Sequence, residues 1–159
     1  MMYLPLALLE RDAPEWLPGL ALAGAAVLAP LGLWAFGRLL AGRSHQVTLG
    51  AGTLLLGVLA LVMAVATTPS LTIAAYLACT MVNGVMPGRW QSAVADAAPE
   101  ADRPRWFAFQ GSSWGVAQPA VPPLAAVAGA VTGAMGAGAF LAAGAAFLLV
   151  PFILRRTPA

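Results

Sequence analysis

Long apolar stretches separated by short polar loops dominate the chain. Five of these stretches reach the ~20 residues that a helix needs to cross a bilayer. They cover residues 17–37, 47–67, 71–95, 106–128 and 133–154. A shorter apolar stretch at residues 1–9 predicts only a partial span. The pattern therefore predicts an all-α membrane bundle, a single transmembrane domain of five full spans and one N-terminal partial span.

Prolines and glycines within these stretches predict local features of the helices. Pro30 is expected to kink its span mildly, and three prolines at 119, 122 and 123 are expected to bend or loosen theirs. Glycines four residues apart share one helix face and favour close packing. We expect such packing at 84/88 and 111/115, and less at 129/133, which falls at a loop.

Composition supports a bilayer environment. The chain is 60% hydrophobic and 9% charged, with a mean hydropathy of +0.83, which leaves too little polar surface for a water-soluble globule. All eight positive residues are arginines and are dispersed, so no nucleic-acid partner is expected. The single Cys79 lies in an apolar run and is interpreted as a small packing residue.

The arginines also predict an orientation. Six of them fall on one side of the bilayer if the spans alternate, and the loops of the opposite side hold only Arg11. The six are Arg38, Arg43, Arg103, Arg105, Arg155 and Arg156. The positive-inside rule then places the C-terminus in the cytoplasm of a multi-pass protein of the cell membrane, of the bacterial inner or plasma membrane type.

Two polar segments resemble loops of the major facilitator superfamily. Residues 95–105, ADAAPEADRPR, precede an aromatic-rich helix start and resemble the loop after the tenth helix of these transporters. Residues 37–43, GRLLAGR, resemble the cytoplasmic loop between helices eight and nine, although the aspartate that often precedes the arginine there is absent. With the number and order of spans, the resemblance implies the C-terminal half of a transporter, from the end of helix seven through helix twelve.

Polar residues inside two spans give candidates for a substrate cavity. Tyr76 and Asn83 share one face of the third full span, with Thr80, Pro87 and Trp90, and Gln110, Trp114 and Gln118 recur every four residues on the fourth. Amides in hydrocarbon need partners, so these faces should point into the protein or a watery cavity. The resemblance implies the same faces. Hydrogen bonds between helices, without a substrate, are the other interpretation, and spans 47–67 and 133–154 can face lipid.

Charged residues supply the remaining candidates. Arg89 is the only charge within a span. It could attract an anionic substrate or bridge to an acid on an N-terminal half, or it could extend to the headgroups or pair structurally. Candidates for a cytoplasmic gate are Arg38, Arg43, Asp96, Arg103 and Arg105. We expect Asp96 to pair with Arg103 or Arg105 across its loop. We expect His45 to be a loop residue that is solvated or lies at the level of the headgroups, and a proton-handling role is the other interpretation.

These observations leave two classes of function. One histidine, one cysteine and no acid within a span predict no enzyme, no metal site and no cofactor. The leading hypothesis is a secondary transporter for efflux or exchange of a small molecule, whose alternating access requires an N-terminal six-helix half or a second copy. The alternative is a small, non-transporting membrane scaffold or assembly protein.

Overall fold

The computed structural model describes residues 3–40 and 42–154, which form helices and no strand. The helices are α1 (Leu4–Leu9), α2 (Leu17–Leu39), α3 (His45–Val65), α4 (Pro69–Asn83), α5 (Met86–Ala97), α6 (Arg103–Thr132) and α7 (Met135–Leu154), with a 3₁₀ turn η1 (Glu100–Asp102). Five segments, α2, α3, α4 with α5, η1 with α6, and α7, are long and apolar enough to cross a membrane. The all-α fold class is confirmed, and the chain is a multi-pass membrane protein.

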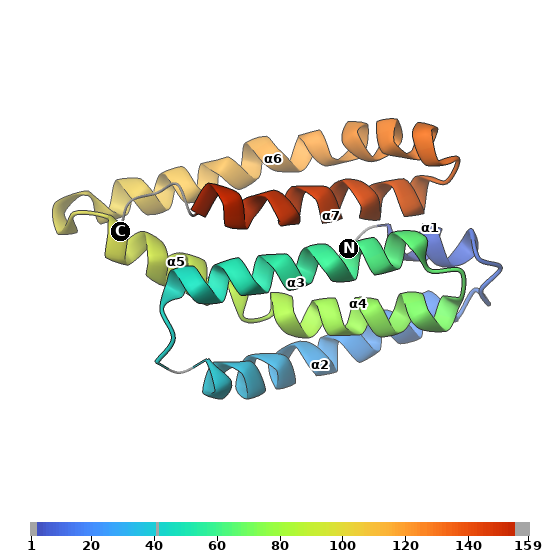
Figure 1. Cartoon of the computed structure of the whole chain (residues 1–159), viewed down its shortest axis with the longest axis horizontal. Coiled ribbons are helices and arrows are strands. Elements are labelled where there is room, and N and C mark those ends of the chain that lie inside the picture. The colour runs from blue at the N-terminus through green and yellow to red at the C-terminus, as the bar shows by residue number, and fades with distance from the viewer. Residues whose placement is uncertain (1–2, 41, 155–159) are drawn as a thin grey trace.

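The long helices lie side by side in the spatial order α6, α7, α3, α4, α2 (Figure 1). The α2–α3 and α5–α6 connections lie at one end of the bundle, and the α3–α4 and α6–α7 turns lie at the other. Arg38, Arg43, Arg103 and Arg105 therefore belong to one end, and Arg11 to the opposite end. Successive spans run in opposite directions, and this alternation places these four arginines at the same end of the bundle, as the predicted topology requires.

Helix boundaries follow from capping residues. Ser44 and Thr68 accept hydrogen bonds from the N–H groups of the third residue after each, at 3.3 and 3.4 Å, and so begin α3 and α4. Prolines, whose missing N–H is tolerated there, stand in the first turn of α1, α2, α4, α5 and α6. Gly133, at φ 74°, ends α6 in the left-handed conformation that glycine adopts readily.

One of the predicted spans is interrupted at a point where no break was expected. The expected span 71–95 is two helices, with Gly84 and Val85 between them. Pro87 has no N–H and cannot donate to the carbonyl of Asn83, four residues earlier, so the helical ladder is opened at that point. By contrast, α6 passes through three prolines and α2 through Pro30 without interruption.

Small residues decide which helices become neighbours. A Cβ added to Gly32 on α2 would lie 2.6 Å from the carbonyl oxygen of Met81, so α2 and α4 meet backbone to backbone. Gly57 and Gly144 face each other where α3 crosses α7. Of the predicted glycine pairs, Gly84 makes such a contact, with the carbonyl of Ala29, and so does Gly129, where less was expected, with the backbone of Met135. An added Cβ at 88, 111, 115 or 133 meets open space. Spacing alone therefore did not locate the close contacts.

The helix α3 has both a buried and an exposed face. It packs on α4, α5 and α7, where Leu49 and Leu56 are each 1% exposed. Leu54, Leu55 and Val58 are exposed apolar residues, so the expectation that this span can face lipid holds for that part of its surface. A nearly apolar helix with small residues can thus pack on several neighbours and still present an apolar face.

The short helix α1 is held by two charged residues that follow it. Arg11 donates to the carbonyl oxygens of Ala66 (2.7 Å) and Met63 (2.9 Å), at the C-terminal end of α3, and to that of Ala7. Glu10 accepts from the N–H of Gly136 at 2.9 Å, in the first turn of α7. A cation at a helix C-terminus and an anion at an N-terminus both match the helix dipole. The loop after α1 thereby ties α1, α3 and α7 together.

The contact at Gly32 yields a test of the packing. Gly32→Ala should lower the melting temperature of the purified protein in detergent, because a methyl group there forces α2 and α4 apart at a cost of about 1–3 kcal/mol. Gly37→Ala on the same helix, where the added Cβ meets nothing within 4 Å, is the matched control and should change the melting temperature little. Equal effects of the two substitutions would contradict the contact.

Candidate functional site

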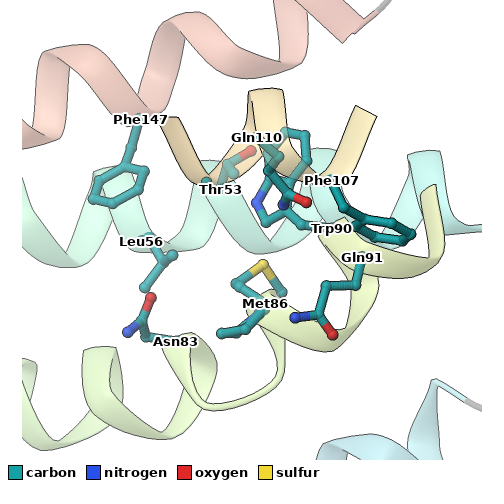
Figure 2. A pocket seen from close by; sticks show the side chains of 11 residues that line it. Thr53, Leu56, Asn83, Met86, Trp90, Gln91, Phe107, Gln110 and Phe147 are labelled. Atoms are coloured by element: carbon teal, nitrogen blue, oxygen red, sulfur yellow. The ribbon is translucent and has the colours of Figure 1, made fainter. Parts of the chain in front are cut away.

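A cavity of about 530 Å³ opens beside the break between α4 and α5 (Figure 2). Five helices contribute to its wall, so residues far apart in the sequence meet there. The described residues that line it are Thr53 and Leu56 of α3, Asn83 of α4, Met86, Pro87, Trp90 and Gln91 of α5, Phe107, Gln110 and Gly111 of α6, and Phe147 of α7. The opened helix thus forms one wall of the cavity.

Three amide side chains supply most of the polarity of the cavity. They belong to Asn83, Gln91 and Gln110, and come from three different helices. Within residues 3–40 and 42–154, no hydrogen bond to protein is found for any of the three amide groups. The hydroxyl of Thr53, in contrast, donates to the carbonyl oxygen of Leu49 in its own helix at 2.7 Å. The amides are therefore the polar groups open to a ligand.

The rest of the wall is aromatic and aliphatic. Phe107 and Phe147 lie at opposite sides of the space in Figure 2, with Met86 between them. No described residue of the wall carries an ionisable acid, imidazole, thiol or amine. The described wall can therefore bind a molecule by its shape and by the hydrogen bonds of its amides.

The structure brings together two of the predicted cavity residues, Asn83 and Gln110. Tyr76 does not line this cavity: it shares the face of Asn83, but it is 3% exposed and packs in the core around α1. Gln118 lies eight residues beyond Gln110, a rise of ~12 Å along α6, and is exposed away from the cavity wall. The Trp114 side chain lies outside the described part of the chain. Residues that share one face of a helix can lie at different depths along its axis, and helical periodicity does not give this depth. The predicted residues differ in depth, so only some of them line the cavity.

Several residues of the cavity wall were not predicted from the sequence. Gln91 could have been found, because Asn83, Pro87 and Gln91 follow one another at intervals of four residues. Phe107 and Phe147 carried no such signal, since aromatic residues in apolar spans are most often packing residues. Their role in the wall depends on how α6 and α7 are placed.

Arg89 does not line the cavity. Its Nη2 donates to the carbonyl oxygen of Leu40 at 2.9 Å, immediately after the last residue of α2. The side chain is half-buried and satisfies a helix terminus that has no partner within its own helix. This is the structural pairing that was one of the two interpretations of Arg89.

Asp96 has a different partner from the one expected. Its Oδ2 lies 3.4 Å from Nε2 of His45, the first residue of α3, and among the described residues it makes no ion pair with Arg103 or Arg105. Arg105 instead lies 3.5 Å from Asp102, because the η1 turn places that acid one turn before it. His45 is therefore the first residue of α3 rather than a loop residue, and its side chain, 31% exposed, lies against α5.

The other gate candidates stay at the surface of the same end. Arg38 lies over the ring of Trp34, 4.4 Å from its centroid, a cation–π contact within α2. Arg43 and Arg103 are exposed. Among the described gate candidates, Asp96 is therefore the one that links neighbouring helices, through its pair with His45.

Comparisons with protein families, with curated proteins and with solved structures find no match to this chain. The resemblance to major facilitator transporters therefore rests on the two loop segments and the order of the spans.

The His45–Asp96 pair can be measured by a double-mutant cycle. His45→Gln, Asp96→Asn and the double variant should show a coupling of at most about 1 kcal/mol in thermal or denaturant unfolding, since both side chains are partly exposed. The same cycle with Arg103→Gln in place of His45→Gln should show no coupling. A larger coupling of Asp96 to Arg103 than to His45 would contradict the assignment.

Proposed function

We propose that this chain is the C-terminal half of a secondary transporter of the major facilitator type, which moves a small molecule by efflux or exchange. The observation that carries the proposal is the cavity beside the α4–α5 break, into which amides of three helices open. Secondary transporters commonly build their substrate sites at interrupted membrane helices, because the interruption exposes polar backbone inside the bilayer. The order of spans and the two loop segments support the same class.

The proposal includes a second bundle opposite the cavity. Alternating access requires one bundle to rock against another around the site. The helix α6 supports such a partner, since Phe109, Gln118 and Val127 are exposed along it. We propose either an N-terminal six-helix half or a second copy of the chain as this partner. A non-transporting scaffold needs no open amides at a helix break.

The proposed orientation places the end with Arg38, Arg43, Arg103 and Arg105 in the cytoplasm of the cell membrane. With Cys79→Ser as background, a cysteine at Ser70 should react with a membrane-impermeant maleimide in intact cells. A cysteine at Glu100 should react only after the membrane is opened. Labelling of Glu100→Cys in intact cells, or its equal reaction in both conditions, would overturn the orientation.

Transport is tested by the release of preloaded labelled compounds, some uncharged, some anionic and some cationic, from cells that produce the chain with its partner bundle. Asn83→Leu and Gln110→Leu should slow release about threefold to tenfold, because each removes a hydrogen-bonding group from the cavity. Gln46→Leu, an exposed amide on α3 outside this cavity, is the matched control and should leave the rate unchanged.

Membrane levels of every variant are compared by immunoblot. Slower release at equal membrane levels supports the proposal. Release by the correctly inserted wild-type chain that does not exceed that of control cells for any compound would overturn it. Parallel losses of protein and release would show that the amides are structural hydrogen-bonding groups.

A further inference from the structure

We infer that the cavity beside the α4–α5 break takes an uncharged small molecule with a flat apolar body and an amide-like hydrogen-bonding group. This inference rests on the proposed transport function and extends it to a substrate class. Three features of the wall carry it: its lack of charge, its unpaired amides and its aromatic side chains.

The charged side chains of α5 contact groups outside the cavity. Arg89 lies on the same helix as Trp90 and Gln91, but its guanidinium is bound to the carbonyl of Leu40 at the end of α2. Asp96, also on α5, lies against His45 at the end of the bundle. An ion in the cavity would therefore find no opposite charge among the described wall residues, and an unpaired charge within a membrane protein is costly.

The amides of the wall indicate which hydrogen-bonding groups a bound molecule should carry. Each primary amide offers two donor hydrogens and a carbonyl acceptor. Asn83, Gln91 and Gln110 thus present both kinds of group, and a ligand with both a donor and an acceptor can pair with them. A pure hydrocarbon would displace water from the amides without replacing its hydrogen bonds, which is unfavourable. A carboxamide, urea or lactam group fits this requirement.

The apolar wall specifies the body of the ligand. Trp90, Phe107 and Phe147 present aromatic surface from three helices, and Met86 adds a flexible thioether. Aromatic side chains favour flat rings through stacked and edge-to-face contacts. The volume of about 530 Å³ falls within the range of roughly 300–1,000 Å³ that is typical of small-molecule sites. A one- or two-ring compound is therefore the expected size.

Three probes of nearly equal shape test the inference: 2-naphthamide, 2-naphthoate and 2-naphthylmethylammonium. Binding to the full chain in lipid nanodiscs is measured by equilibrium dialysis. 2-Naphthamide should bind at least about tenfold more tightly than either ion, because both ions would lie unpaired against the wall. Equal or tighter binding of the carboxylate or the ammonium compound would overturn the inference, as would no detectable binding of the amide.

A matched pair of variants locates the binding. Gly111 lines the cavity and a Cβ there meets nothing within 4 Å, so Gly111→Leu should fill the space and abolish amide binding without disturbing the helix packing. Gly19→Leu, on α2 and equally open, should bind as the wild type does. Retained binding in Gly111→Leu, at an unchanged melting temperature, would overturn the assignment of the ligand to this cavity.

The binding measurement separates this inference from the proposed function. Selective amide binding by a chain that releases no compound from cells would leave the ligand class standing and refute transport. Release of anions or cations in preference to uncharged compounds, with slower release in Gln110→Leu, would support transport and refute the ligand class.

Discussion

A helix in a bilayer satisfies its own backbone groups except at its ends and its breaks, and this constraint places the polar side chains of the chain. Arg11 bonds carbonyl groups at the end of α3, and Arg89 bonds one at the end of α2. Glu10 accepts from an N–H in the first turn of α7. The signs of these charges suit the helix dipoles. These three charged side chains are thus engaged with helix ends, and the described residues that line the cavity carry no charge.

Steric fit between helices determines their order. Lipid tails are as apolar as the helix surfaces, so burial alone does not choose a neighbour, and close backbone contact does. Gly32 sets α2 against α4, and Gly57 with Gly144 sets α3 against α7. These contacts put α3 in the middle of the helices, with α6 at one margin and α2 at the other (Figure 1).

The cavity results from both constraints acting at one place. Pro87 opens the helical ladder after Asn83, and the bulky side chains of Trp90, Phe107 and Phe147 occupy the margins of the space between α5, α6 and α7. Because the arginines are bound at helix ends, the groups left facing the space are amides and aromatic rings. Such a surface suits the binding of a molecule by shape and hydrogen bonds.

The sequence by itself determined the number of spans, their approximate limits, and the presence of amides in spans 71–95 and 106–128, because hydrophobic length and helical periodicity are local properties. It also identified Asn83 and Gln110. Only the tertiary structure decided that Tyr76 is buried, that Gln118 lies beyond the cavity, that Asp96 pairs with His45 and that Arg89 binds the end of α2. Those outcomes depend on the depth and rotation of each helix against its neighbours. Backbone contacts at a few glycines fix this depth and rotation, and the periodicity within one span does not reveal them.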